Sequence, residues 1–86
     1  MKVYREDDWM AEVEVLKDES DSEWERYTLK IVGTLRVSRI YKPIPDGEII
    51  NVHQKRDTAF GGMWTLRDEK IVRGAYTVKG EENEIP

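Results

Sequence analysis

The sequence predicts an all-β fold: one small, five-stranded, strongly bent sheet or barrel that starts with a long β-hairpin. Two observations lead to this prediction. Apolar and polar side chains alternate with a period of two along much of the chain, which is typical of strands with one buried face. No segment has the pattern of a long helix. The 86 residues leave room for one core, so we expect one domain over residues 1–80 and a mobile acidic tail over 81–86.

The first predicted strand covers residues 9–17. Ala11, Val13 and Val15 alternate there with glutamates, so the valines are expected to face inward and the glutamates to face water. A helix over residues 6–19 is the alternative, because Glu, Leu, Met and Ala favour helices. We favour the strand, since two valines placed two positions apart do not follow a period of 3.6.

The second predicted strand covers residues 26–37 and has the clearest periodicity in the chain. Five apolar residues of this stretch occupy odd positions: Tyr27, Leu29, Ile31, Leu35 and Val37. A straight strand of this length would span about 40 Å, which is longer than most strands, so a bulge or bend is expected at Gly33. Residues 18–23 lack apolar side chains and are expected to form the exposed hairpin loop between the two strands.

The predicted register of this hairpin brings the apolar faces of the two strands together. The inward pairs would be Val15 with Tyr27, Val13 with Leu29 and Ala11 with Ile31. The same register places Glu12 opposite Lys30, and it places Trp9 against the backbone of Gly33. Opposite charges on neighbouring strands stabilise a sheet, so part of the charge of this region is expected to be paired internally.

The remainder of the chain is expected to form a proline-containing loop and three shorter strands. Residues 41–47 contain two prolines and a Pro-Asp-Gly turn, which exclude a central strand. A third strand follows over residues 48–55, with Ile50 and Val52 on one face and His53 on the other. The fourth and fifth strands are expected over 63–67 and 70–78, the latter with a bulge at Gly74.

A turn followed directly by a predicted strand occurs at Pro45–Val52, and a predicted strand with an aromatic residue follows at Gly62–Leu66. This arrangement is similar to SH3-like barrels and covers about a third of the chain. The acidic and aromatic segment with which SH3 domains begin their peptide site is not recognisable, so no proline-peptide site is carried over. An OB-like barrel, whose first three strands form a curved meander, is the competing architecture.

The charge is distributed unevenly along the chain. Residues 1–25 carry ten acids and three bases, residues 26–80 carry eleven bases and five acids, and residues 81–86 carry three acids, for a net charge of −4. The sequence pI of about 5.0 disfavours a nucleic-acid domain, since those usually have a pI above roughly 9. The basic middle of the chain nevertheless leaves an anionic partner possible.

Composition also restricts the class of protein. The longest uninterrupted apolar run has three residues, Trp9–Ala11, so neither a membrane span nor a secretory leader is expected. The absence of cysteine excludes disulfides and fits a reducing compartment, and we predict a cytoplasmic location.

Catalytic and metal sites are not predicted. The one histidine, His53, lies on a strand without a nucleophile motif, and a transition-metal site needs more than one His or Cys. Glu6–Asp8 and residues 18–25 lack the ligand order of a calcium loop, so both are expected to be solvated acidic loops. Gly61–Gly62 lacks a phosphate-loop context and is read as a hairpin loop. We predict no cofactor and no enzyme activity.

The remaining pattern is a set of basic residues interleaved with aromatic ones. The predicted binding residues are Arg39, Tyr41, Lys42, His53, Lys55, Arg56, Phe60 and Trp64. Loops on a rigid scaffold often carry function, and exposed cations with aromatics are typical of protein interfaces. The leading hypothesis is a binding or assembly module for a protein partner, through the loops 39–42 and 55–62. Single-stranded nucleic acid on the same face is the alternative.

Overall fold

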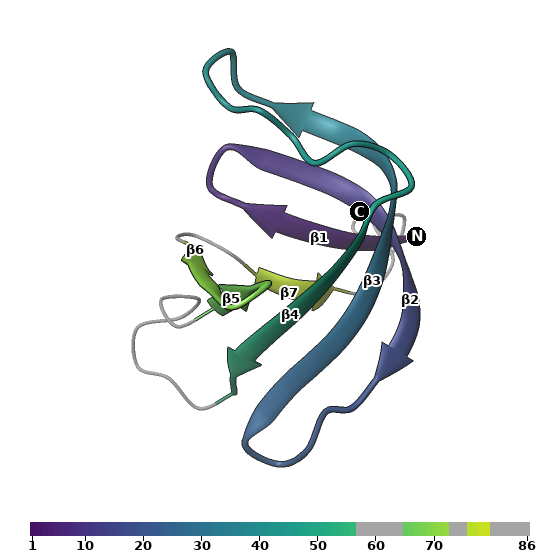
Figure 1. Cartoon of the computed structure of the whole chain (residues 1–86), viewed down its shortest axis with the longest axis vertical. Helices are drawn as coiled ribbons and strands as arrows, with labels where there is room; N and C mark the ends of the chain where they lie inside the picture. The colour runs from purple at the N-terminus through teal and green to yellow at the C-terminus, as the bar shows by residue number, and fades with distance from the viewer. Residues whose placement is uncertain (57–64, 73–75, 80–86) are drawn as a thin grey trace, which may run out of the picture.

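The computed structural model describes residues 1–56, 65–72 and 76–79, which form one antiparallel β-sheet (Figure 1). The strands are β1 (Lys2–Glu6), β2 (Trp9–Asp18), β3 (Trp24–Val37), β4 (Ile49–Lys55), β5 (Thr65–Arg67), β6 (Lys70–Val72) and β7 (Tyr76–Lys79). The predicted all-β class is confirmed, since these ranges contain no helix. In particular, they hold no helix long and apolar enough to cross a membrane.

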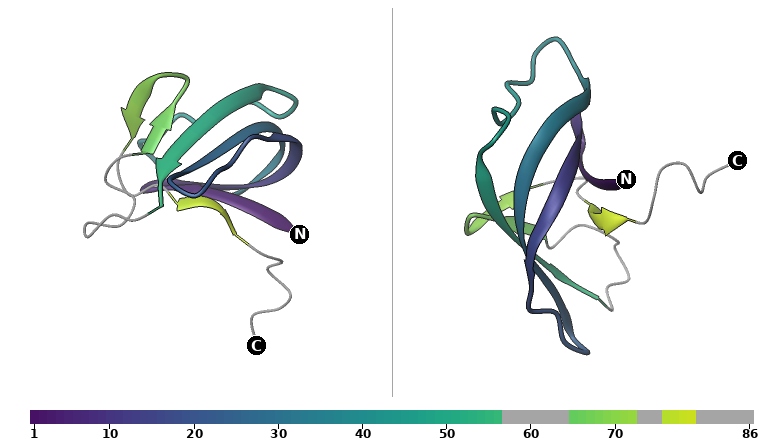
Figure 2. Two further views of the ribbon diagram at one scale, coloured as in Figure 1. Left: turned by 90° about the horizontal axis from the view of Figure 1, so that it is seen from below. Right: turned by 90° about the vertical axis from the view of Figure 1, so that its right-hand side faces the viewer.

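The sheet curls into a half-barrel. Its strand order is β6-β5-β4-β3-β2-β1-β7, so each strand up to β6 pairs with its neighbours in the chain, whereas β7 pairs with β1. Only three residues separate the end of β6 from the start of β7, although these strands are the two edges of the sheet. The edges must therefore curl toward each other, as Figure 2 shows, and β4 contacts β7. The predicted strongly bent sheet is confirmed.

The strand count differs from the prediction of five. The expected strand over residues 70–78 is two strands, β6 and β7, on opposite edges of the sheet. The expected bulge at Gly74 lies outside the described residues, and the expected strand 63–67 is described from Thr65 onward. The additional strand β1 was not predicted at all.

Strand β1 lacks the alternation that reveals a half-buried strand. Val3 and Tyr4 are consecutive and both buried, and Glu6 is buried too, with 4% of its surface exposed. The prediction that Glu6 belongs to a solvated acidic loop is therefore wrong. A carboxylate is rarely buried without a partner, and this one has several, described below.

The hairpin of β2 and β3 forms as predicted, but its register is shifted, by two residues at Val13 and Val15 and by three at Ala11 and Glu12. Val15 pairs with Leu29 instead of Tyr27, and Val13 pairs with Ile31 instead of Leu29. Glu12 lies opposite Gly33, so the predicted Glu12–Lys30 pair is wrong, and Glu14 is the residue opposite Lys30. A shift of two keeps every side chain on its face, which is why the apolar pattern did not reveal it.

The register of β2 and β3 shifts on both sides of Gly33, which confirms the predicted irregularity there. The first shift adds Val32 to β3, so that Thr34, and not an odd-numbered residue, lies opposite Ala11; the second shift adds Leu35. Leu35 and Val37, expected in the core, are exposed. Trp9 pairs with Val37 instead of facing Gly33, and its indole nitrogen donates a hydrogen bond to Thr34 Oγ1 over 2.9 Å.

One apolar core fills the concave side of the sheet. Its buried members come from β1 to β4: Tyr4, Trp9, Ala11, Val13, Leu29, Ile31, Ile50 and Val52. The placement of Ile50 and Val52 on the inner face of β4 and of His53 on the outer face agrees with the prediction. Tyr41 and Ile44 pack against this core from the segment between β3 and β4.

Candidate functional site

The β3–β4 loop (residues 38–48) is fastened to the sheet at both ends. At its start, the amide of Ser38 donates to the carbonyl of Asp8 over 2.9 Å, in the turn between β1 and β2. At its end, the amide of Gly47 donates to the carbonyl of Ile31 over 2.7 Å, and the amide of Ile31 donates to the carbonyl of Glu48 over 2.9 Å. Gly47 has φ = 88°, a conformation that glycine adopts without strain.

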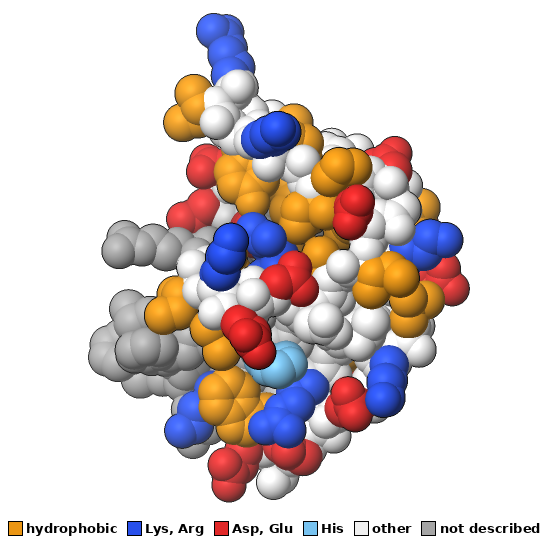
Figure 3. Space-filling model, viewed as in Figure 1, with side chains coloured by type: hydrophobic (Ala, Val, Ile, Leu, Met, Phe, Trp, Pro, Cys, Tyr) orange, Lys and Arg blue, Asp and Glu red, His pale blue; other side chains and the backbone are white. Residues whose placement is uncertain are grey.

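Between these anchors, the loop displays an apolar side chain and two cations. Ile40 is 92% exposed, more than any other large hydrophobic side chain of the described residues. Arg39 and Lys42, on either side of it in sequence, are exposed as well. Figure 3 shows basic and hydrophobic side chains together at the projecting tip of this loop, at the top of the view. The chain thus presents an unburied isoleucine between two positive charges.

Tyr41 points the other way and ties the loop to the interior. Its ring stacks on Trp9, with 6.2 Å between the ring centroids and 18° between the planes. Its hydroxyl donates a hydrogen bond of 2.5 Å to Glu6 Oε1. Tyr41 was predicted as part of the partner-facing surface, but it is half-buried and its hydroxyl is already bonded.

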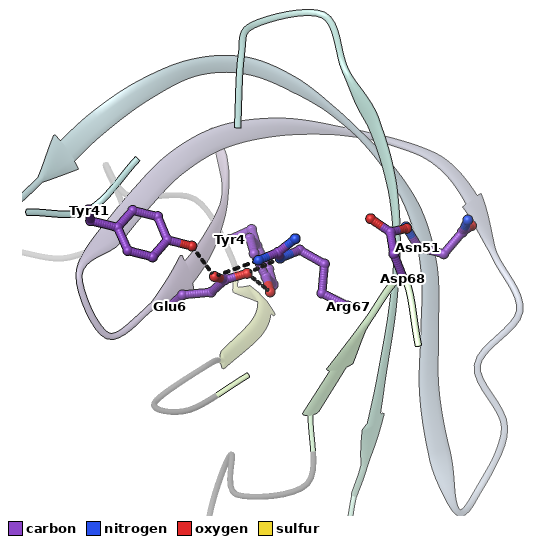
Figure 4. A network of polar contacts seen from close by, with 6 residues as sticks. All are labelled: Tyr4, Glu6, Tyr41, Asn51, Arg67 and Asp68. Atoms are coloured by element: carbon purple, nitrogen blue, oxygen red, sulfur yellow. Dashed lines mark hydrogen bonds and ion pairs between the residues drawn. The ribbon is translucent and has the colours of Figure 1, made fainter. Parts of the chain in front are cut away.

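Glu6 is the centre of a polar network inside the half-barrel (Figure 4). Its Oε2 accepts hydrogen bonds from the Tyr4 hydroxyl over 2.6 Å and from Arg67 Nε over 2.5 Å. Its Oε1 accepts from Tyr41 and, over 3.4 Å, from Arg67 Nη2. A carboxylate has about four lone-pair sites, so these four hydrogen bonds, which come from three residues, use its whole capacity.

The surroundings of Glu6 shift the pKa of each donor in the network. Burial, the hydrogen bond to Glu6 and the charge of Glu6 raise the pKa of Tyr41 to about 12. Burial and the charge of Glu6 raise the pKa of Tyr4 far above its usual range. Burial works to lower the pKa of Arg67, but the hydrogen bond and charge of Glu6 outweigh it and raise that pKa. All three donors therefore keep their protons near neutral pH.

A hollow of about 320 Å³ opens beside this network. It is lined by Glu6, Asp7, Asp8, Tyr41, Arg67 and Val72. Because the Glu6 carboxylate is fully hydrogen-bonded, it has no free lone pair to offer a ligand in this hollow. The described residues contain no group of three His, Cys, Asp or Glu side chains placed to hold a metal ion.

The other predicted cations lie at the opposite end of β3, on the outer face of the sheet. Trp24, the first residue of β3, lies opposite Lys55, and Arg26 lies opposite His53. The guanidinium of Arg26 lies over the ring of Trp24, 5.8 Å from its centroid. Nearby, Arg56 Nε donates to the carbonyl of Asp21 over 2.7 Å. We call these residues, Trp24, Arg26, His53, Lys55 and Arg56, the hairpin-end cluster.

The predicted binding residues therefore do not form one face. Arg39, Tyr41 and Lys42 follow the last residue of β3, whereas His53, Lys55 and Arg56 lie beside its first residues. Phe60 and Trp64 lie outside the described residues. Sequence reasoning also missed Glu6, Trp9 and Arg67 as the residues that fix Tyr41. The sole indication of Glu6 in the sequence was its spacing of two from Tyr4, which puts both on one face of a strand.

A second hollow, of about 370 Å³, lies on the outer face beside the hairpin of β5 and β6. Its lining residues are Asn51, His53, Leu66, Asp68 and Glu69. Asp68 is bound to β4, because its Oδ1 accepts the amide of Asn51 over 3.0 Å and its own amide donates to the Asn51 carbonyl over 2.8 Å. Asp68 and Glu69 have φ of 50° and 69°, which is the pattern of a type I′ turn made without glycine.

No protein-family model matches the chain, and the searches of curated proteins and of solved structures found no match either.

Proposed function

We propose that this protein is a small non-catalytic binding module that docks a protein partner through the β3–β4 loop. The observation that carries the proposal is the exposure of Ile40, 92%, between the exposed cations Arg39 and Lys42 on a loop fastened at both ends. This replaces the single large face expected from the sequence with one compact site.

The chemistry of the loop indicates the kind of partner. Burying apolar surface stabilises a complex by roughly 25 cal/mol per Å², so an isoleucine held in water is a favourable group to cover. Two cations beside it favour a partner whose apolar hollow is bordered by carboxylates, which steer association and fix orientation. A loop that is already ordered loses little conformational entropy on binding, which favours affinity.

The non-catalytic part of the proposal is supported by the state of the polar groups. Glu6, the one buried carboxylate of the described residues, is saturated by four hydrogen bonds from three residues. His53 lies on the outer face, opposite Arg26 and Leu66, with no nucleophile among these partners. A cytoplasmic location stays a prediction that rests on composition.

A capture experiment tests the docking proposal. The full chain is immobilised, and a partner is isolated from the native source and then titrated in purified form. The variant Arg39→Glu/Ile40→Ser/Lys42→Glu is expected to weaken its binding at least tenfold, with an unchanged melting curve. The matched control is Lys70→Glu/Ile71→Ser, since Ile71 is 62% exposed beside the exposed Lys70 on β6. Equal binding by the loop variant and the wild type would refute the proposal.

The hairpin-end cluster favours a second candidate function, single-stranded nucleic-acid binding. Aromatic side chains stack on bases, and cations contact phosphates; here the half-buried Trp24 has Arg26 and Lys55 beside it. The acidic loop between β2 and β3 lies at the same end, and its negative charge repels a polyanion. We therefore rank this function second.

Fluorescence titration distinguishes the second function from the first. Mixed-sequence oligonucleotides at low salt are expected to quench tryptophan emission, and the quenching should weaken as salt rises. The variant Lys55→Glu should bind more weakly, while the loop variant at Arg39, Ile40 and Lys42 should behave as the wild type. An absence of quenching at low salt would reject nucleic-acid binding and leave the docking proposal standing.

A further inference from the structure

The β3–β4 loop reaches the interior of the half-barrel mainly through one side chain. The backbone contacts at Ser38 and Gly47 hold only the two ends of the loop. Between them, Pro43 and Pro45 restrict the backbone dihedrals, so the intervening segment is stiff. Ile44 packs against the core, and Tyr41 both packs on Trp9 and bonds to Glu6. The position of the segment that displays Ile40 thus depends on Tyr41.

Glu6, the residue that Tyr41 binds, is itself held in place by donors from two strands, its own strand and β5. Glu6 lies on β1, the Tyr4 hydroxyl binds it from the same strand, and Arg67 binds it from β5. Arg67 supplies the positive charge that offsets the burial of the carboxylate. Charge-assisted hydrogen bonds of this kind are roughly twice as strong as neutral ones. Figure 4 shows the Tyr41 hydroxyl, the carboxylate and the guanidinium converging on one point.

We propose that Glu6 is a positioning residue that latches the β3–β4 loop to the sheet through the Tyr41 hydroxyl, and that breaking this contact lets the loop open about Ser38 and Gly47. In the latched state, Arg39, Ile40 and Lys42 project in one arrangement. In the open state, Tyr41 leaves the ring of Trp9, and Glu6 keeps only Tyr4 and Arg67 as donors. That the latch controls binding rests on the proposed docking function; the latch itself is a property of the chain alone.

Limited proteolysis measures loop opening without any partner. Trypsin cleaves after Arg39 only when the loop departs from its folded conformation, whereas the Lys42–Pro43 bond is resistant because proline follows the lysine. Cleavage after Lys30, which pairs on both sides within β3, requires unfolding of the sheet. The ratio of cleavage after Arg39 to cleavage after Lys30 therefore separates local opening from global unfolding.

The variant Tyr41→Phe retains an aromatic ring that can pack on Trp9 and removes only the hydroxyl that bonds to Glu6. It is expected to raise the cleavage ratio about tenfold, as the loss of a hydrogen bond to a charged group predicts. Glu6→Gln should raise the ratio less, because its amide oxygen still accepts from Tyr41. The matched control is Tyr27→Phe, which removes a hydroxyl that donates to Glu25 over 3.1 Å at the other end of β3, and which should leave the ratio unchanged.

Each outcome decides one of the two proposals. An unchanged ratio in Tyr41→Phe overturns the latch, whatever the partner assay shows. A tenfold rise confirms the latch. The docking proposal then requires that Tyr41→Phe weakens partner binding, although the variant still carries Arg39, Ile40 and Lys42. If Tyr41→Phe fails to fold, amide hydrogen exchange in Glu6→Gln supplies the same comparison. Relative to the wild type, exchange is expected to become faster in residues 38–48 and to stay unchanged in β2 and β3.

Discussion

The two ends of β3 each hold a tyrosine hydroxyl bonded to a glutamate, and they differ in what surrounds the pair. At the end near the β3–β4 loop, Tyr41 donates to the buried Glu6, which Arg67 also binds. At the hairpin end, Tyr27 donates over 3.1 Å to Glu25, whose carboxylate is only half-buried, so that water competes for it. The same chemical pair thus fixes a loop at one end and contributes little at the other.

The ion pairs of the two regions differ in the same way. Glu6 and Arg67 have 4% and 21% of their side chains exposed, against 60% and 64% for Glu19 and Lys17 in the β2–β3 hairpin. An exposed pair is solvated and screened, whereas the removal of one partner from a buried pair leaves a charge with no compensation. Burial therefore decides which polar contacts determine the structure, and the following predictions test that conclusion.

The largest difference is expected when each ion pair loses its cation. Arg67→Met leaves Glu6 buried without a counter-ion and should lower the free energy of unfolding by about 3–5 kcal/mol. Lys17→Met at the exposed pair should lower it by no more than about 0.5 kcal/mol. Urea denaturation of both variants measures the two changes. Similar losses in the two variants would show that burial is not the deciding factor.

The loss of a single hydroxyl should give the next largest difference. Tyr4→Phe removes one donor from the buried carboxylate and is expected to cost about 1.5–3 kcal/mol of unfolding free energy. Tyr27→Phe removes the donor of a partly exposed bond, so the loss should stay below about 0.5 kcal/mol. The same denaturation assay applies, and an equal cost at both tyrosines would contradict the comparison.

The turn that follows Arg67 differs from the acidic loop of β2 and β3 in backbone strain. Glu69 has a positive φ of 69°, which costs a non-glycine residue about 1 kcal/mol. Glu69→Gly is expected to raise the free energy of unfolding by roughly 0.5–1 kcal/mol. Glu19→Gly, placed where no positive φ is needed, should give no increase. A loss of stability in Glu69→Gly would mean that its side chain makes a stabilising contact.

The smallest expected effects are local and occur at opposite ends of the pH scale. The pKa of Tyr41 is raised to about 12. The contribution of its hydroxyl to the free energy of unfolding is therefore complete below the usual pKa of about 10 and is lost as pH rises through 12. The amides of Trp24 and Glu23 lower the pKa of Asp21, so its contribution is complete above about pH 4 and is lost at lower pH.

Spectroscopy resolves these two titrations. Tyrosinate absorbance of the wild type should show one group titrating near pH 12 that is absent in Tyr41→Phe. The amide chemical shifts of Glu23 and Trp24 should move in acid, below the ordinary range of an aspartate, because both amides donate to Asp21 Oδ1 over 2.8 Å. Titration of Asp21 at an ordinary aspartate pKa would show that the hairpin loop is not ordered by these bonds.

Much of the fold was predictable because the period of two is a local property. It located β2, β3 and β4 to within two residues, and it placed Ile50 and Val52 in the core. Strand β1 was missed because its buried glutamate reads as a surface residue until its partners are known. The register was missed by two residues because such a shift changes no face; the bulges beside Gly33 decide it.

The candidate site was less predictable, since it depends on curvature. The exposure of Arg39 and Lys42 follows from a proline-rich segment that cannot join a strand. The bond from Tyr41 to Glu6 joins residues 35 positions apart, and the bond from Arg67 to Glu6 joins residues 61 apart. Only the curl of the sheet brings these groups together, and no pattern along one strand contains that information.

The pairing of β7 with β1 has a further consequence, for the order of folding. It joins Val3 to Lys79, whereas every other strand pair links neighbours along the chain. Closing a long loop costs more conformational entropy than closing a short hairpin, and distant contacts form slowly. The meander from β1 to β6 can therefore assemble from local hairpins, and we expect closure of the half-barrel by β7 to be the slowest step. Strand β1 therefore has one unpaired edge until β7 joins the sheet.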